Sequence, residues 1–150
     1  MTDVVLLDAG PLGMVSHPRA SVAIVEWLAR LVAAGIPVMI PEIADYEVRR
    51  ESLRAGRRRG VERLDQLRVG LGFVPITSDA MVRAAAFWAD ARRRGRATAG
   101  DQSLDADVIL AGQAATLGRG QVVVASSNPR HIARFVPAHR WQDIPAAKSS

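Results

Sequence analysis

The sequence predicts an α/β protein whose parallel β-sheet is covered by helices on both faces. Short apolar runs at residues 4–7, 38–40 and 122–125 alternate with longer segments in which apolar side chains recur at helical spacing. Strands that are apolar throughout are typical of parallel sheets, because both faces of such sheets are buried. The alternation of strands with helices favours the same architecture. The length of 150 residues suits one domain, which is expected at residues 1–145 with a disordered tail at 146–150.

The first strand is expected at residues 4–7, where a β-branched start leads directly into Asp8. A helix is expected to begin at Pro18 and to stop at Gly35. Its apolar face would consist of Val22, Val25, Trp27, Leu28 and Leu31. A second short strand is expected at residues 38–40.

Pro41 suits the first turn of the next helix, which is expected over residues 42–55. Beyond this helix, Gly56 and Gly60 are expected to interrupt a strongly basic stretch. The apolar segment at residues 73–76 contains a proline, so it is at best an edge strand.

Thr77 is a suitable N-cap for a further helix, which is expected to end near residues 92–95. A loop is expected at residues 95–103 and another helix at residues 103–117. The strand at residues 122–125 then leads into a polar turn.

Arginine gives the chain its basic character. The sequence has 20 Lys+Arg against 15 Asp+Glu, a net charge of +5, and 19 of the basic residues are arginine. Arginine pairs well with phosphate groups, so nucleic acid is one expected partner. A coding preference for arginine would give the same composition without any function, and composition alone does not separate these two explanations.

Several classes of protein are excluded by the composition. The chain has no cysteine, which excludes a disulfide framework and a thiolate zinc site. Its three histidines are scattered and form no ligand cluster in the sequence. The longest uncharged stretch has 11 residues, against the ~20 that a membrane helix needs. The amino-terminal segment lacks the basic start of a signal peptide, so we expect a cytoplasmic protein with no membrane partner.

Asp8 is the first candidate site residue, because it closes a buried apolar run. A carboxylate there is costly unless something pairs with it, and ligand sites in parallel sheets gather at the carboxyl ends of strands. The structural alternative is a helix cap or a turn former beside Gly10.

Glu47 is the second candidate. On a helix that begins near Glu42, Glu47 lies about 40° from Ile43, on the side expected to face the protein. Its structural alternative is an ion pair with Arg50, three residues further along the same helix.

Asp107 is the third candidate. It lies about 60° from Leu104, at the margin of an apolar helical stripe, whereas Asp105 lies about 100° away on the other side. Both acids would reach one site only if the helix began at Asp105, so Asp107 is the inward candidate. The structural alternative is the favourable placement of acids in a first helical turn.

These three carboxylates are expected to meet at one end of the sheet. Two like charges 4 Å apart repel by roughly 4 kcal/mol at an effective dielectric of 20, so such a group requires a cation. Oxygen ligands without thiolates or clustered histidines favour Mg²⁺ or Mn²⁺ over zinc. A carboxylate-bound metal beside an arginine-rich surface indicates phosphodiester chemistry.

Four segments of the chain, taken in order, resemble the PIN domain and, within it, the VapC-like toxins. They are residues 4–12 (VVLLDAGPL), 40–51 (IPEIADYEVRRE), 104–111 (LDADVILA) and 122–132 (VVVASSNPRHI). The resemblance covers nearly the whole chain, residues 3–141. It implies a PIN-like three-layer α/β/α fold with a central parallel sheet of four to five strands, and a ribonuclease activity that depends on Mg²⁺ or Mn²⁺.

The resemblance also implies roles for particular residues. By position in the four segments, Asp8, Glu47 and Asp107 would be the catalytic, metal-binding acids, and Asp105 an additional candidate ligand.

The turn after the last strand departs from the family pattern. Many family members carry another acid there, where this chain has Ser126, Ser127 and Asn128. Asn128 and Ser126 are the candidate substitutes, since an amide oxygen can bind a metal or hold a water. The structural alternative for Asn128 is an Asx turn.

Arginines form two dense groups, one within residues 49–68 and one within residues 92–96. The first group follows directly on the helix of Glu47, so we expect it to lie near the site and to contact RNA. The alternative is a solvated helix face. The RNA-binding candidates are Arg50, Arg54, Arg57 and Arg58.

Three functions are consistent with the resemblance. The first is the toxin of a VapBC-type toxin–antitoxin pair, which cuts RNA and is held silent by a small antitoxin protein. The second is a PIN-like RNA-processing nuclease outside such a pair, and the third is a non-catalytic RNA- or protein-binding module with a degenerate site. Family members commonly form homodimers, so a homodimer is expected as well.

Overall fold

A parallel five-stranded sheet, in the order β3-β2-β1-β4-β5, forms the centre of the molecule. The computed structural model describes residues 2–95 and 101–146. The strands are β1 (Val4–Leu7), β2 (Val38–Pro41), β3 (Gly72–Val74), β4 (Val122–Ser126) and β5 (Ala138–Arg140). The helices are α1 (Ala9–Ser16), α2 (Val22–Ala33), α3 (Glu42–Arg54), α4 (Arg58–Gly70), α5 (Ser78–Arg93) and α6 (Asp101–Ala115), with short 3-10 helices η1 (Ile132–Arg134) and η2 (Trp141–Asp143).

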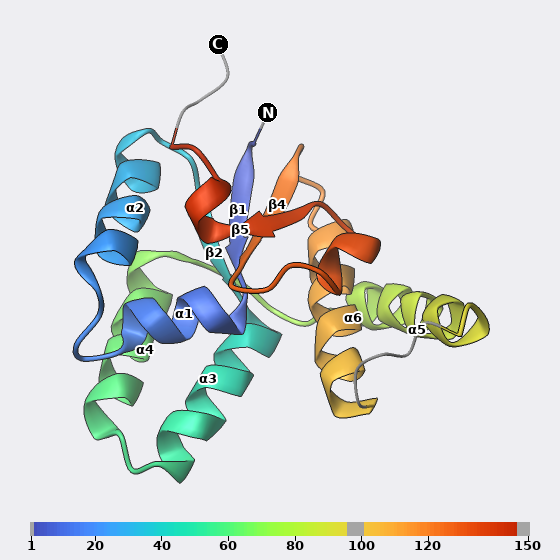
Figure 1. Cartoon of the computed structure of the whole chain (residues 1–150), viewed down its shortest axis with the longest axis horizontal. Coiled ribbons are helices and arrows are strands. Elements are labelled where there is room, and N and C mark those ends of the chain that lie inside the picture. The colour runs from blue at the N-terminus through green and yellow to red at the C-terminus, as the bar shows by residue number, and fades with distance from the viewer. Residues whose placement is uncertain (1, 96–100, 147–150) are drawn as a thin grey trace.

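Helices cover both faces of the sheet and give the PIN-like three-layer α/β/α architecture that the sequence predicts (Figure 1). Helices α2 and α4 lie on one side, and α5 and α6 lie on the other. Helices α1 and α3 lie at the end toward which β1 runs. This end of the sheet is therefore where the loops and helix starts that follow the strands come together.

Strand β1 lies at the centre of the sheet, between β2 and β4. Its four residues are fully buried because they have a partner strand on each side and helices on both faces. Leu7 is in register with Ala125 of β4, and the backbone N–H of Asp8 donates to the Ala125 carbonyl at 2.9 Å. The chain thus delivers Asp8 to the middle of the carboxyl edge.

The two faces of the sheet have separate cores, because side chains alternate along each strand. On one face, Leu7 packs in a cluster that includes Trp27 from α2. On the other face, Leu6 packs in a cluster that includes Leu110 from α6 and Ile132 from η1. No helix among the described residues is long and apolar enough to cross a membrane.

Helix α1 was not anticipated from the sequence, because two glycines and a proline stand in its eight residues. Asp8 caps this helix, and Pro11 lies in the first turn, where backbone N–H groups have no helical partner to lose. Gly10 is needed at its position because a Cβ there would run into the side chain of Ser127. Burial of Leu12 and Val15 outweighs the weak helix propensity of the segment.

Helix α2 begins at Val22, four residues after the predicted start, and its buried face differs from the prediction. Val22 and Val25 are 71% and 44% exposed, whereas Ile24 is fully buried. Trp27 is buried, stacks at 5.6 Å on Trp141, and donates from its indole N–H to a backbone carbonyl near the end of the described chain. That end is held by packing, and Ala146, predicted to belong to a loose tail, rests against the same core.

Helix α4 corrects the prediction that two glycines interrupt the basic stretch. Gly56 does end α3, with a φ of +70° that L residues rarely adopt. Gly60 instead lies inside α4, where it is buried against Ser52 of α3. Arg49 ties the two helices together, because it bonds Asp45 on α3 and Asp65 on α4 at 3.0 and 2.8 Å.

Helices α5 and α6 pack closely against each other. Thr77 caps α5 as predicted, and its hydroxyl accepts from the Ala80 N–H at 3.0 Å. A Cβ on Gly112 of α6 would collide with the Ala80 backbone, so glycine permits this close contact. Helix α6 begins at Asp101, two residues before the predicted start, and most of the predicted loop before it lies outside the described residues. The tail at 147–150 also lies outside them.

A buried glutamine connects three elements near the carboxyl edge. Gln113 of α6 is 1% exposed. Its amide N–H donates to the Val74 carbonyl of β3 at 2.7 Å, and its side-chain oxygen accepts from the Ile43 N–H in the first turn of α3 at 3.3 Å. The helices that carry Glu47 and Asp107 are therefore fixed relative to each other by one side chain.

Candidate functional site

Asp8 directly follows β1 at the carboxyl edge of the sheet. The chain continues from β1 to β2 on one side, and from β4, on the other side of β1, to β5. Open parallel sheets bind their ligands where connections leave in opposite directions in this way. One carboxylate oxygen accepts from the Ala9 N–H and the other from the Ser126 hydroxyl, both at 2.7 Å. Burial raises the pKa of Asp8 above its ordinary value, and the two hydrogen bonds oppose that rise. Asp8 is thus the helix cap that the sequence offered as its structural alternative, and it is also a half-buried acid at the carboxyl edge.

Glu47 projects from the second turn of α3 and is half-buried. Burial raises the pKa of Glu47, and repulsion from Asp8 adds to the rise, while the Arg50 guanidinium opposes it. The predicted pairing with Arg50 is therefore an electrostatic contribution to Glu47, and it coexists with a second carboxylate nearby.

Asp107 projects from α6 and is also half-buried. Burial, followed by repulsion from Asp8 and from Glu47, raises the pKa of Asp107 to about 6, while Arg134 opposes the rise. Asp107 therefore responds to both other predicted acids, so the structure brings the three carboxylates into one electrostatic cluster.

The donor set of this acid cluster (Asp8, Glu47 and Asp107) suits a hard divalent cation, because all three members are carboxylates whose charged form is disfavoured by burial, and at Glu47 and Asp107 also by repulsion within the cluster. Within residues 2–95 and 101–146, no three acidic or histidine side chains are close enough together to be direct ligands of one ion. Mg²⁺ usually keeps several of its waters and binds through one or two carboxylates. The acid cluster fits an ion held in that way.

Ser126 orients Asp8 from the neighbouring strand. Its side chain is buried, its hydroxyl donates to Asp8, and it accepts from the Asn128 N–H at 3.1 Å. Asn128 is exposed. Of the two residues predicted to replace the missing acid, Ser126 thus contacts the cluster through Asp8, and Asn128 contributes its backbone to the turn.

Asp105 lies on an exposed part of α6. It lines a hollow of about 480 Å³ between α3 and α6, together with Glu47 and Arg50. Because α6 begins at Asp101, Asp105 lies inside the helix and points to a different side from Asp107. The structure therefore places Asp105 beside the cluster.

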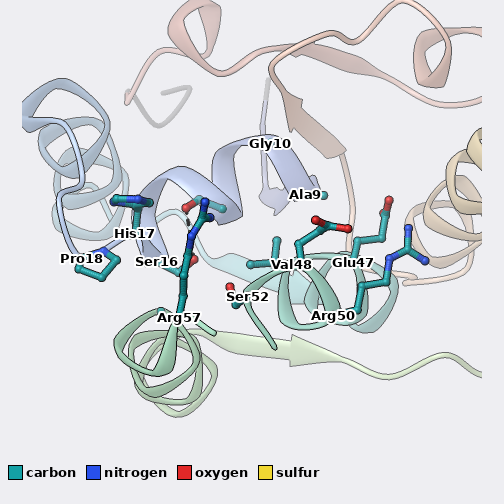
Figure 2. Close-up of a pocket in the computed structure, with 13 residues that line it drawn as sticks. Ala9, Gly10, Ser16, His17, Pro18, Glu47, Val48, Arg50, Ser52 and Arg57 are labelled. Atoms are coloured by element: carbon teal, nitrogen blue, oxygen red, sulfur yellow. Dashed lines mark hydrogen bonds between the residues drawn. The ribbon is translucent and has the colours of Figure 1, made fainter. Parts of the chain in front are cut away.

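Two of the four predicted RNA-binding arginines line one groove. Arg50 and Arg57 border a cavity of about 330 Å³ between α1, α3 and the start of α4, together with Glu47 (Figure 2). Arg54 is exposed and pairs with Glu51 at 2.8 Å. Arg58 lines a separate hollow on the far side of Arg57.

Arg134 is a site residue that was not predicted from the sequence. It is half-buried on η1, donates to the carbonyl of His131 at 3.4 Å, and lowers the pKa of Asp107 by its charge. The sequence shows it only as one arginine after the polar turn, and its approach to α6 depends on how η1 folds back. The signal that was available is its position soon after a strand end at the carboxyl edge.

Comparison of the sequence with protein-family models and with curated proteins finds no match. Comparison of the structure does. One similar chain comes from VapBC2 of Rickettsia felis, whose structure was solved with a DNA fragment from the VapBC2 promoter. It has a TM-score of 0.72 at 11% identity, with 92% of this chain and 98% of that chain covered. A chain of VapBC-1 from nontypeable Haemophilus influenzae has a TM-score of 0.70 at 14% identity, with 93% and 99% covered. A chain of DNA-bound VapBC from Salmonella typhimurium has a TM-score of 0.66 at 20% identity, with 94% and 99% covered. The fold of this chain is the fold of these proteins, which confirms the fold that the resemblance in the sequence implied.

Proposed function

We propose that this protein is a metal-dependent endoribonuclease, and that Asp8, Glu47 and Asp107 hold Mg²⁺ or Mn²⁺ directly or through water. The observation that supports this proposal best is the electrostatic coupling of three carboxylates at the carboxyl edge, each disfavoured in its charged form. Such an arrangement is costly without a cation and suited to one with it. Asp105 would be an outer ligand through water, since it lies beside Glu47.

The residues of the site suit hydrolysis of a phosphodiester. A bound divalent ion would lower the pKa of a water and orient the phosphate. Ser126 keeps Asp8 in one orientation through its hydrogen bond. A carboxylate of the acid cluster accepts the proton of the attacking water. Arg50 and Arg134 flank the cluster, near Glu47 and Asp107 respectively, where they balance negative charge on the substrate.

RNA would bind along the arginines of α3 and α4. Arg50, Arg54, Arg57 and Arg58 are all exposed, so their guanidinium groups are accessible to phosphates. Binding through such contacts weakens as salt rises, by about one in the logarithmic slope for each contact. Binding that is insensitive to salt would contradict this part of the proposal.

We further propose that the protein is the toxin of a toxin–antitoxin pair. The support is the fold it shares with chains solved as VapBC complexes. A small partner protein would then silence cleavage, and co-purification with the product of a neighbouring reading frame tests this. A homodimer is proposed as well, and light scattering of the purified protein measures its mass.

The central test is cleavage of an RNA panel with Mg²⁺, with and without EDTA. We expect wild-type protein to cut RNA only with the metal, and Asp8→Asn and Glu47→Gln to bind RNA without cutting it. Matched controls are Asp143→Asn and Glu26→Gln, which remove exposed acids of η2 and α2 that are not members of the acid cluster. Full metal-dependent cleavage by Asp8→Asn or Glu47→Gln would show that the acid cluster is not the catalytic site.

A second candidate function is a non-catalytic RNA- or protein-binding module. It is favoured by one observation, which is that the turn after β4 offers the exposed amide of Asn128 where many relatives of the resembled family carry an acid. RNA binding without any Mg²⁺-dependent cleavage would support it. Cleavage without a silencing partner would instead support an RNA-processing nuclease outside a toxin pair.

A further inference from the structure

A groove extends from the acid cluster along α3 to the start of α4. It has a volume of about 330 Å³, within the range of ligand clefts. Figure 2 shows Glu47 and Arg50 at one end, His17 and Pro18 at the other, and the Arg57 side chain reaching toward α1 between them. One end of the groove is therefore part of the proposed catalytic site, and the other end is not yet explained by it.

Three glycines contribute backbone to the walls of the groove. Gly10 and Gly13 of α1 and Gly60 of α4 all line it. At Gly13 an added Cβ would make only ordinary contact, 3.9 Å from a Val48 methyl group. Backbone therefore forms much of the wall of a space that a small side chain could enter without strain.

The far end of the groove carries the exposed positive charge of Arg57, which also helps to lower the pKa of Glu51 on the same wall. Arg57 is exposed and forms no ion pair or hydrogen bond through its guanidinium with the residues that the structure describes. Glu51, the acid on the same wall, is instead paired with Arg54 at 2.8 Å. Arg57 is also the N-cap of α4, which has no side-chain cap, so the positive end of the helix dipole adds to its charge.

His17 adds a hydrogen-bond donor at the same end. Its Nδ1 accepts from the Arg19 N–H at 3.0 Å. In the neutral ring the proton then resides on Nε2, which is a donor for a phosphate or hydroxyl oxygen. The far end thus presents a permanent positive charge and a hydrogen-bond donor, whereas the near end presents carboxylates.

We infer that this groove is the subsite for the RNA strand on one side of the scissile phosphate, and that Arg57 binds a backbone phosphate at its far end. The inference rests on the proposed function, since it takes the acid cluster as the point of cleavage. A phosphodiester strand matches this pattern, because its phosphates repeat along one direction: one faces the metal-binding acids and a later one faces Arg57. The consequence is that affinity depends on strand length.

The test measures binding of fluorescein-labelled oligouridylates of 2 to 12 nucleotides by anisotropy, in EDTA so that the strands stay intact. For wild type we expect affinity to rise in a step at the length that reaches Arg57, and to level off afterwards. In Arg57→Ala the step disappears, and the longer strands bind about tenfold more weakly because one charge-assisted contact is lost. The salt slope for those strands falls by about one.

The matched control is Arg58→Ala, which removes the adjacent exposed arginine from a different hollow. We expect it to keep the length step. A second variant, Gly13→Leu, places a larger apolar side chain in the wall of the groove without removing a charged group, and its helical position favours leucine over glycine. We expect it to keep its melting temperature and to lose the step. The inference is overturned if Arg57→Ala and Gly13→Leu both bind every length as wild type does, or if Arg58→Ala loses the step to the same extent.

The inference and the proposed function fail separately. RNA cleavage by wild type without a length step overturns the groove subsite and leaves the nuclease. A length step that depends on Arg57, in a protein that cuts no RNA with Mg²⁺, overturns the nuclease and leaves the groove. If no oligouridylate binds at all, the groove subsite is overturned, and cleavage of RNA with Mg²⁺ still decides the nuclease separately.

Discussion

The two ends of the groove along α3 hold their charges in opposite ways. At one end, half-buried carboxylates are placed by helix positions and, for Asp8, by hydrogen bonds, and burial raises the pKa of each. Asp8 adds to the rise at Glu47, and Asp8 and Glu47 add to the rise at Asp107. At the other end, Arg57 is exposed, and its guanidinium forms no ion pair or hydrogen bond with the described residues, although its charge helps to lower the pKa of Glu51. At the acid end the fold therefore determines the geometry, and the charge varies with pH or metal. At the basic end the charge is constant, and the side-chain geometry is free to change.

The largest effect that follows from this contrast is expected for Asp107→Asn. Cleavage should fall on the order of 10²–10³-fold, as for loss of one group that stabilises developing charge. The metal-free protein should nevertheless become more stable at pH 7, because the substitution removes a carboxylate whose pKa is raised to about 6. Thermal melting in EDTA and cleavage in Mg²⁺ measure the two effects.

A variant that is less stable than wild type would show that burial and repulsion do not disfavour the charged Asp107 carboxylate. The control is Asp79→Asn, which removes an exposed acid at the start of α5 and should change neither the cleavage rate nor the response to EDTA.

A smaller effect is expected for Ser126→Ala, which removes the hydroxyl bonded to Asp8. That bond lowers the pKa of Asp8, so its loss raises the pKa further and weakens metal binding. The Mg²⁺ concentration for half-maximal cleavage should rise about tenfold, the size of one hydrogen bond to a charged group. The acidic limb of the pH–rate profile should move to higher pH, which a loss of stability alone would not cause.

Two substitutions define the specificity of the Ser126 effect. Ser126→Thr keeps the hydroxyl and should restore most of the metal affinity. Ser127→Ala alters the exposed neighbour and should behave as wild type. Equal metal affinity in Ser126→Ala and wild type would mean that the hydroxyl does not position Asp8.

A still smaller effect concerns pH. Without metal, the folded protein binds a proton at Asp107 near pH 6, whereas the unfolded chain binds it only near the ordinary value of 3.8. Stability should therefore rise as pH falls from 7 toward 4, by on the order of 1–2 kcal/mol after allowing for solvent screening. The raised pKa values of Asp8 and Glu47 act in the same direction.

Melting in EDTA between pH 5 and 7 measures this pH effect. The gain should be reduced in Asp107→Asn, and adding Mg²⁺ at pH 7 should reproduce it in wild type. The raised pKa of Asp107 would be contradicted if wild-type protein lost stability as the pH fell from 7 to 5 and Asp107→Asn did not.

The smallest effect is expected at the exposed end, for Arg54→Ala. Arg54 lowers the pKa of Glu51 through their ion pair, but both side chains are exposed, so solvent and salt screen the pair. The melting temperature should not change measurably. RNA affinity should fall slightly and equally for all strand lengths, in contrast to Arg57→Ala.

The fold was predictable because its strands are short, apolar and separated by helical segments. Helices α1 and α4 were not, because glycines at positions 10, 13 and 60 indicated breaks. Their presence is explained only by tertiary contacts: Gly10 allows α1 to pass Ser127, and Gly60 allows α4 to pack on Ser52. Local sequence does not contain these partners.

The positions of the three acids, one at a strand end and two on helices, could be predicted from the sequence pattern, and their role as a metal site stays a prediction. Their partners could not be predicted in the same way. Ser126 is 118 residues from Asp8 in the chain, to which its hydroxyl donates. Arg134 acts on Asp107 from a later segment, after β4. The division of the arginines between the groove and other surfaces also depends on where α4 begins.

The side-chain bonds of Gln113 have a consequence for how the molecule assembles. Its partners are 39 and 70 residues earlier in the chain, on β3 and at the start of α3. Contacts between such distant segments form late, because a long loop must be closed before they contribute. The N-terminal half can thus form its local helices early, while the relative placement of Glu47 and Asp107 is completed only when α6 docks. A chain interrupted before α6 would contain Asp8 and Glu47 without the arrangement that makes them a site.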